Sequence, residues 1–178
     1  MQYSQISGDI QGAVIELYRS VFSDSEGESE GVAIESLVKA LLTGTPKDEI
    51  MGYVASDGGK LVGAILLTRM TFSKGGDGWL LSPVAVSSAE QGKGVGQALI
   101  RFGLSSLKDQ GATLVVTYGD PAFYSKVGFQ SLPESMIEAP YPLSQPVGWI
   151  YQTLNDEALT HSLGKAQCVK GFSNPALW

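Results

Sequence analysis

Near the N-terminus, apolar side chains recur every three to four positions, which predicts a helix over residues 9–22 with Asp9 as its N-cap. A second run with the same spacing predicts a helix over residues 32–42 that ends near Gly44. The polar, acidic stretch between them, residues 23–31, has too little apolar surface to bury. It is expected to form a mobile loop.

The middle of the chain is dominated by strand-forming residues. Residues 51–70 hold two such runs, separated by Asp57-Gly58-Gly59, and predict a β-hairpin because glycine supplies the positive φ of a tight turn. A further strand is expected over residues 79–86, followed by a helix over 94–110 and a strand over 113–118. This strand, crossover helix and strand predict a parallel pair. The fold class is therefore α/β, with a central mixed sheet, an interrupted strand and flanking helices.

Pro83 lies in the middle of the expected strand 79–86 and has no N–H to donate to a neighbouring strand. A regular interior strand does not accept proline, so we expect the hydrogen-bond ladder to be interrupted there by a bulge. Such an interruption leaves the backbone groups of residues 84–86 without strand partners. A ligand with amide groups of its own would satisfy them.

Glycines occupy alternate positions, Gly92, Gly94 and Gly96, where the helix after this strand begins. The first N–H groups of a helix lack partners within it, and the helix dipole favours an anion there. Residues 91–96 are thus a candidate pyrophosphate cradle, with Lys93 nearby to add positive charge. A P-loop needs Ser or Thr after the Lys, and a dinucleotide fingerprint needs Gly or Ala where Gln97 stands. A tight strand-to-helix connection without a ligand is the alternative.

A second short helix is expected after the strand 113–118. Asp120 is placed as its N-cap and Pro121 at its first position, and Gly128 ends it, so residues 121–127 should be helical. Tyr124 lies on this helix. The alternative to a functional role for Tyr124 is a core aromatic residue with a satisfied hydroxyl.

Composition narrows the classes of function. The chain has 178 residues, a formal net charge of −6, one cysteine (Cys168) and one histidine (His161). A negative charge argues against nucleic-acid binding, and isolated Cys and His argue against a metal site or an internal disulfide. The length fits one domain, and no segment is apolar enough to span a membrane or resembles a signal peptide. We therefore expect a soluble, cytoplasmic protein without a metal.

Residues 91–96, QGKGVG, match the Q/R-x-x-G-x-G/A signature of the GCN5-related N-acetyltransferase (GNAT) family, and the chain resembles that family. Residues 119–129, GDPAFYSKVGF, resemble its second motif, in which a tyrosine precedes an xxxGF ending. The whole chain is similar to a bacterial subgroup of predicted acetyltransferases with the phrase LGDPxYYxRFGF. It departs from that phrase at Tyr118, Phe123, Lys126 and Val127, and residues 154–178 match only loosely. The resemblance implies an acetyltransferase domain over residues 1–153 and a C-terminal extension over 154–178 that packs on it.

The resemblance implies acetyl-CoA as co-substrate. Its pyrophosphate would bind the N–H groups of residues 91–96, and its pantetheine amides would pair with residues 84–86. The implied cofactor-binding residues are Val84, Ala85, Val86, Gln91, Gly92, Lys93, Gly94, Val95 and Gly96. The N–H of Val86 would stabilise the oxyanion, and Tyr124 would protonate the departing thiolate as a general acid.

An amine acceptor with an ordinary pKa near 10.4 must lose a proton before it attacks. Carboxylates at Glu26, Glu28, Glu30 and Glu35 are candidates for the general base, and Glu35 is preferred because the subgroup also carries a glutamate there. A solvated helix face with a water chain as the base is the alternative.

Two other classes of function stay open on sequence alone. The chain could bind acyl-CoA without catalysis, as a sensor or partner-binding module, or it could be a nucleotide or sugar-phosphate enzyme that uses the same glycine turn. For the transferase, the expected partner is a small-molecule or peptide amine, with no nucleic acid and no membrane. The sequence leaves the acceptor and a homodimer undecided.

Overall fold

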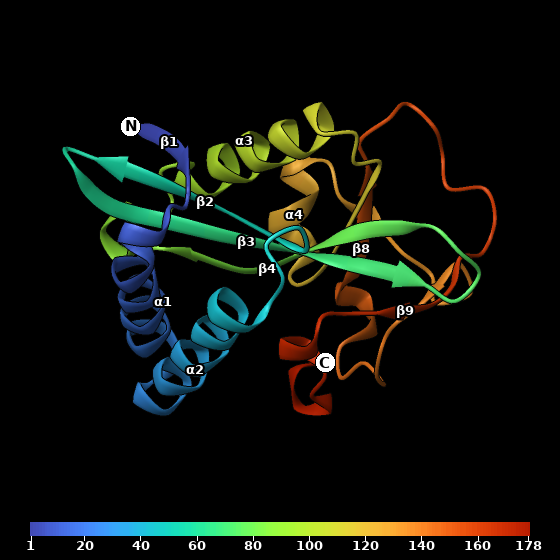
Figure 1. Ribbon diagram of the computed structural model, residues 1–178, viewed down its shortest axis with the longest axis horizontal. Coiled ribbons are helices and arrows are strands. Elements are labelled where there is room, and N and C mark those ends of the chain that lie inside the picture. Colours follow the sequence, from blue (N-terminus) through green and yellow to red (C-terminus); the bar gives the residue numbers. More distant parts are fainter. The chain divides into compact units, whose positions relative to one another are not determined.

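Figure 1 shows the computed structural model, which describes residues 1–178. These residues group into two units. Unit 1 consists of Met1–Leu67 and Pro83–Gly103, and unit 2 of Thr68–Ser82 and Leu104–Trp178. Three elements contribute residues to both units, namely β3 (Lys60–Phe72), β4 (Asp77–Val86) and α3 (Val95–Asp109).

Unit 1 is a layer of strands with helices on both faces. Strand β1 (Gln2–Gln5) runs antiparallel to β2 (Ile50–Asp57), and β3 follows β2 through a turn at Gly58 and Gly59, whose φ angles are 55° and 81°. The predicted hairpin is therefore confirmed. Helices α1 (Gln11–Glu26) and α2 (Glu28–Gly44) lie on one side of these strands and α3 on the other (Figure 1).

Two expectations about the N-terminal helices are wrong. Asp9 does not cap α1, because it lies in a short 3-10 helix (Gly8–Ile10) and the residue that precedes α1 is Ile10. The acidic segment 23–31 is not a loop, because α1 continues to Glu26 and α2 begins at Glu28. Gly27 alone joins the two helices, with φ 99°.

The acidic segment has ion-pair and hydrogen-bond partners in the folded chain. The Arg19 guanidinium contacts Glu28 at 2.7 Å and Glu35 at 3.0 Å, and the Ser23 hydroxyl donates to Glu28 at 3.2 Å. Glu28 and Glu30 also lie in the first turn of α2, where the helix dipole favours negative charge. Composition alone does not reveal these partners.

Helices α1 and α2 cross closely at Gly31, and Gly31→Ala is expected to lower the free energy of unfolding by about 1–3 kcal/mol. A Cβ at this position would overlap the Ser23 hydroxyl and lie 2.9 Å from the Arg19 carbonyl oxygen. Urea unfolding would measure the loss. Gly12→Ala is the control, since a Cβ at Gly12 meets nothing within 4 Å. Equal stability of Gly31→Ala and the parent protein would contradict the close crossing.

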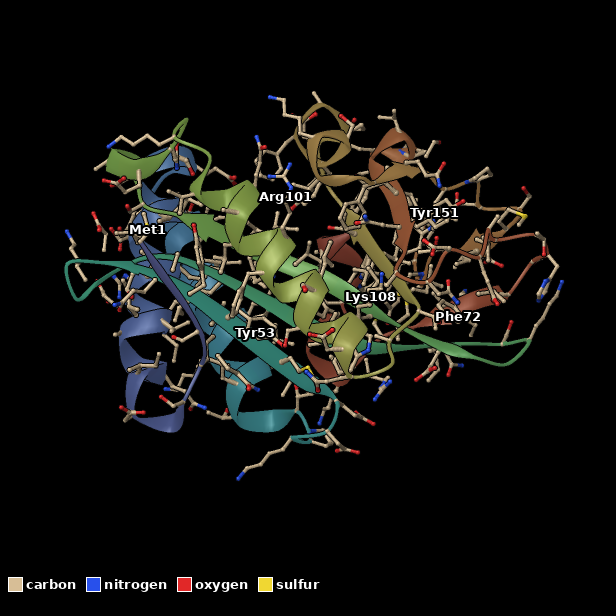
Figure 2. All side chains as sticks on the ribbon, turned by 90° about the horizontal axis from the view of Figure 1, so that it is seen from above. Met1, Tyr53, Phe72, Arg101, Lys108 and Tyr151 are labelled. Atoms are coloured by element: carbon tan, nitrogen blue, oxygen red, sulfur yellow. The ribbon has the colours of Figure 1, made fainter.

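On the opposite face of unit 1, α3 packs closely on the strands. A Cβ at Gly103 would lie 2.7 Å from Ile65 Cδ1 and 3.2 Å from Tyr53 Cδ2. The Tyr53 ring meets the Phe102 ring edge to face at 5.7 Å, and Figure 2 shows Tyr53 next to α3. These contacts hold the second half of α3, around Phe102 and Gly103, close against β2 and β3.

Unit 2 is built on β5 (Leu114–Tyr118), which runs parallel to β4 and antiparallel to β8 (Trp149–Thr153). The predicted parallel pair is confirmed. Strand β6 (Gln130–Ser131) pairs with β8, while β9 (Gly164–Gln167) pairs with the end of β3 and with β7 (Ile137–Glu138). Helix α4 spans Pro121–Tyr124.

Further 3-10 helices cover Ser88–Glu90, Ser125–Val127, Pro146–Gly148, Lys170–Phe172 and Pro175–Leu177. None of the helices combines the length and the apolar character that a membrane span requires. The division into residues 1–153 and 154–178 stays a prediction.

Candidate functional site

The glycine-rich turn before α3 presents its backbone to open space. Gly92 and Gly94 have φ angles of 75° and 82°, which side chains other than glycine rarely adopt. A Cβ at either position would meet no heavy atom within 4 Å. A ligand can therefore approach this backbone without displacing any part of the protein.

The first N–H groups of α3 lie directly after this turn. The helix begins at Val95, and the bond from Ala98 N to the Gly94 carbonyl is 3.0 Å long. The N–H groups ahead of Ala98 precede this first helical bond and carry the positive end of the helix dipole. The Lys93 ammonium pairs with Glu90 at 3.3 Å, so its positive charge is partly neutralised. The anion-binding character of the turn therefore comes mainly from the backbone.

The end of β4 and the glycine turn are joined by a side chain. Gln91 Nε2 donates to the Val86 carbonyl oxygen at 2.9 Å. This bond brings residues 84–86 and 91–96 together, as the candidate binding site requires. It also corrects one expectation, because the Val86 carbonyl is not without a partner: the Gln91 side chain folds back and satisfies it.

Around Pro83, side-chain hydroxyls replace backbone donors. Strand β4 is continuous over residues 77–86, and it pairs with β5 at Leu80–Val116. The next carbonyl along β4, that of Leu81, accepts from the side-chain hydroxyl of Thr117 at 2.7 Å. The Pro83 carbonyl accepts from the buried Tyr18 hydroxyl at 2.8 Å. Proline has no N–H, so the backbone polar group of residue 83 is fully satisfied within unit 1. Nothing in the sequence pattern indicated Tyr18 as this partner.

In unit 2, Tyr124 is held at the end of α4. Asp120 caps this helix by accepting from Ala122 N at 2.9 Å, and Gly128, with φ 98°, ends the 3-10 turn that follows, as predicted. The Tyr124 ring packs edge to face on Phe123 and Phe129, at 5.0 and 5.6 Å between centroids. These contacts hold the Tyr124 ring in place and do not involve its hydroxyl.

The environment of the Tyr124 hydroxyl favours its neutral form. Burial raises the pKa of the Tyr124 phenol above its ordinary value of 10.0, a hydrogen bond with Thr117 partly offsets the increase, and the Asp120 carboxylate adds to it. The phenol therefore keeps its proton at neutral pH. That is the form a general acid must have.

Glu35 lies on α2 in unit 1, and one of its two carboxylate oxygens has a hydrogen-bond partner. Its Oε2 accepts from Arg19 Nη1 at 3.0 Å, which leaves Oε1 to accept a further proton or hydrogen bond. Its side chain is 33% exposed, against 69% for Glu28, which shares the same arginine. Glu26 and Glu30 are exposed. Among these carboxylates, Glu35 is the most shielded from solvent. Sequence reasoning did not identify Arg19 as its partner.

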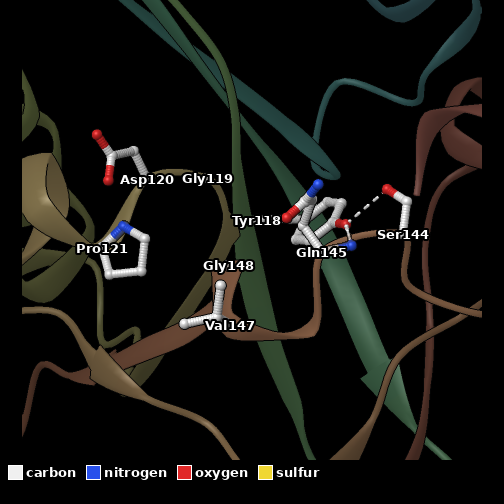
Figure 3. Close-up of a pocket in the computed structure, with 8 residues that line it drawn as sticks. All are labelled: Tyr118, Gly119, Asp120, Pro121, Ser144, Gln145, Val147 and Gly148. Atoms are coloured by element: carbon white, nitrogen blue, oxygen red, sulfur yellow. Dashed lines mark hydrogen bonds between the residues drawn. The ribbon is translucent and has the colours of Figure 1, made fainter.

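Unit 2 also contains a pocket of about 410 Å³ that sequence reasoning missed (Figure 3). It is lined by Tyr118, Gly119, Asp120, Pro121, Ser144, Gln145, Val147 and Gly148. The only signal in the sequence was the proline- and glycine-containing stretch of residues 140–148, which is typical of an irregular loop. No group of three or more His, Cys, Asp or Glu side chains is placed to hold a metal ion.

Comparison with known proteins identifies the family. Residues 48–131 match the family model described as an acetyltransferase (GNAT) domain. YjhQ of Escherichia coli (strain K12), an uncharacterized N-acetyltransferase by its name, is 35% identical over 147 residues, which cover 79% of this chain and 81% of YjhQ. The chain belongs to the GNAT family. The resemblance in its motifs is thus confirmed, and this GNAT chain is an N-acetyltransferase.

Solved structures show that the GNAT chain also has the GNAT fold. The N-acetyltransferase YhbS from Escherichia coli, in complex with CoA, has a TM-score of 0.83 at 24% identity, over 97% of this chain and 92% of that one. A GNAT acetyltransferase from Brucella melitensis, in complex with acetyl-CoA, has a TM-score of 0.74 at 21% identity, over 97% of both chains. The expected mixed α/β fold is confirmed.

Proposed function

We propose that this GNAT chain transfers an acetyl group from acetyl-CoA directly to a primary amine. The observation that carries the proposal is the open glycine turn before α3, where Gly92 and Gly94 expose their backbone beside the N-terminus of a helix. The N–H groups of residues 91–96 would hold the pyrophosphate, and the backbone of residues 84–86 would pair with the pantetheine amides. The CoA and acetyl-CoA complexes of the two structural neighbours support this assignment.

In the proposed reaction, the amine nitrogen attacks the thioester carbonyl carbon, and the new C–N bond forms as the carbonyl oxygen becomes an oxyanion. The Val86 N–H stabilises that oxyanion. The C–S bond then breaks, and Tyr124, which burial keeps protonated, donates its proton to the departing thiolate. The nitrogen, positively charged after the attack, releases a proton that restores the Tyr124 phenol, and the products are the acetylated amine and CoA.

Glu35 is the proposed general base, and Oε1 is the atom that would take the proton from the amine. A lysine-like amine with a pKa near 10.4 is neutral in only about one molecule per thousand at pH 7. Removing this proton is therefore a necessary step. The pairing of Oε2 with Arg19 fixes the carboxylate in one orientation.

Glu35→Gln is expected to lower kcat/KM by roughly 10²- to 10⁴-fold, the usual contribution of a positioned base. The rate of CoA thiol release would measure this. Glu28→Gln is the matched control, because it removes the other carboxylate bound by Arg19. Equal losses in the two variants would assign the effect to Arg19, and no loss in Glu35→Gln would favour a water chain as the base.

The activity itself is tested by acetyl-CoA-dependent thiol release over a panel of polyamines, aminoglycosides, amino acids and peptides. Thermal shifts with CoA, ATP and NAD would run beside the assay. We expect CoA to raise the melting temperature most and at least one amine to support turnover. CoA binding without turnover on any amine would indicate a binding module, and stabilisation by ATP or NAD alone would refute the CoA site.

A further inference from the structure

We propose that the pocket of unit 2 binds the non-reacting part of the acceptor amine and selects against acceptors that carry a negative charge there (Figure 3). This inference rests on the transferase activity proposed above. The acceptor class it names is a primary amine whose remaining part is uncharged and polar, or cationic.

Hydrogen bonds link the two sides of the pocket. The Tyr118 hydroxyl accepts from Gln145 N at 2.6 Å and lies 3.0 Å from Ser144 Oγ, a pair drawn in Figure 3. On the other side, Gly119 N donates to the Gly148 carbonyl at 3.0 Å. These bonds tie the end of β5 to residues 144–148. The cavity is therefore formed before a ligand arrives, which lowers the entropy cost of binding.

Trp178 supports the pocket from behind. Its indole stacks on the Tyr118 ring, with centroids 6.1 Å apart and 17° between the planes, and its N–H donates to the Phe172 carbonyl at 3.1 Å. Its backbone oxygen accepts from Ser144 N at 3.3 Å. Trp178 is only 6% exposed. The extension 154–178 thus contributes the residue that fixes both Tyr118 and Ser144.

The pocket adjoins the proposed general acid. Gly119 lines it, and a Cβ at Gly119 would lie 2.5 Å from Cε2 of Tyr124. The ring of Tyr124 therefore lies directly behind this part of the wall. Asp120 and Pro121, at the start of the helix that carries Tyr124, line the pocket as well. A molecule held here would lie across this wall from the ring of Tyr124, the side chain that is proposed to protonate the thiolate.

The charges at the pocket define what it accepts. None of the eight lining residues is Lys, Arg or His, and the one carboxylate is that of Asp120. An anionic group entering the pocket would lose water without gaining a cationic partner, which is costly. Tyr118, Ser144 and Gln145 supply hydroxyl and amide groups, while Pro121 and Val147 supply apolar surface. The lining suits a neutral or cationic amine with hydrogen-bonding groups.

The first test fills the pocket. Val147 is 70% exposed, so Val147→Trp should fold, and its indole should occupy pocket volume. For any amine that the parent enzyme acetylates, we expect KM to rise by at least about tenfold while the Kd for CoA stays unchanged. Ala158→Trp, at an exposed position of the same unit, is the control and should leave KM unchanged.

The second test compares free amino acids with their amides, such as lysine with lysinamide, which differ in the negative charge. We expect kcat/KM to be at least about tenfold higher for the amide. An acid acetylated as well as its amide, or an unchanged KM in a folded, active Val147→Trp enzyme, would overturn the pocket assignment alone. If none of the amines tested supports thiol release, the proposed function is refuted, and the pocket assignment with it.

Discussion

Gly94→Glu is expected to raise the Kd for CoA by at least about 100-fold, equivalent to about 2.7 kcal/mol, while the protein stays folded. The new carboxylate would stand where the pyrophosphate is proposed to bind, and its side chain would fill space that is empty of protein atoms within 4 Å of the Cβ. Like charges at contact distance and the blocked approach act in the same direction. Isothermal titration with CoA would measure the change.

Gly59→Glu provides a matched control for backbone strain and charge. Gly59 has φ 81°, against 82° for Gly94, and a Cβ at either position meets nothing within 4 Å. Both variants should therefore lose similar stability, but Gly59→Glu should bind CoA like the parent protein. Unchanged CoA affinity in a folded Gly94→Glu protein would remove the glycine turn from the proposed site.

Tyr124→Phe should lower turnover by roughly 10²- to 10⁴-fold, the range expected for loss of a positioned proton donor. The substitution keeps the ring that packs on Phe123 and Phe129 and removes only the hydroxyl. The Kd for acetyl-CoA should change little, because the hydroxyl is assigned to the leaving group. Single-turnover kinetics would measure the chemical step separately from product release.

Tyr151→Phe is the control, since it removes a hydroxyl from β8, a strand with no assigned catalytic group. If the Tyr124 hydroxyl serves only the interior of unit 2 through Thr117, stability should fall by about 1 kcal/mol and the rate should survive. A folded Tyr124→Phe enzyme with a parental single-turnover rate would exclude the general-acid role.

Local chemistry explains which elements the sequence predicted. The Gly58-Gly59 hairpin, the Asp120 cap and the turn at Gly94 each depend on residues adjacent in the chain, and each is found where expected. The acidic segment 23–31 was predicted wrongly because the prediction considered its composition alone, whereas in the structure Glu28 pairs with Arg19 from the preceding turns of α1. The pattern of polar and charged residues within a segment does not reveal partners that lie outside it.

The same distinction holds at the candidate site. The glycine turn and Tyr124 stand in recognisable motifs, so sequence alone proposed them. The pocket was missed because its wall joins Tyr118 to Gln145 and Trp178, residues far apart in the chain that no periodicity connects. The partner of the Val86 carbonyl was missed for a related reason, because the Gln91 side chain has rotamers that point elsewhere.

The single-residue connection at Gly27 limits how this region can change during evolution. An inserted or deleted residue between α1 and α2 would alter the turn at φ 99° and shift the crossing at Gly31, where the Arg19 carbonyl leaves no room for a side chain. Loops usually diversify by insertions and deletions, and we do not expect such changes at this connection. We expect homologues to vary this part of the protein by replacing side chains on the two helices while conserving the spacing from Arg19 to Glu35.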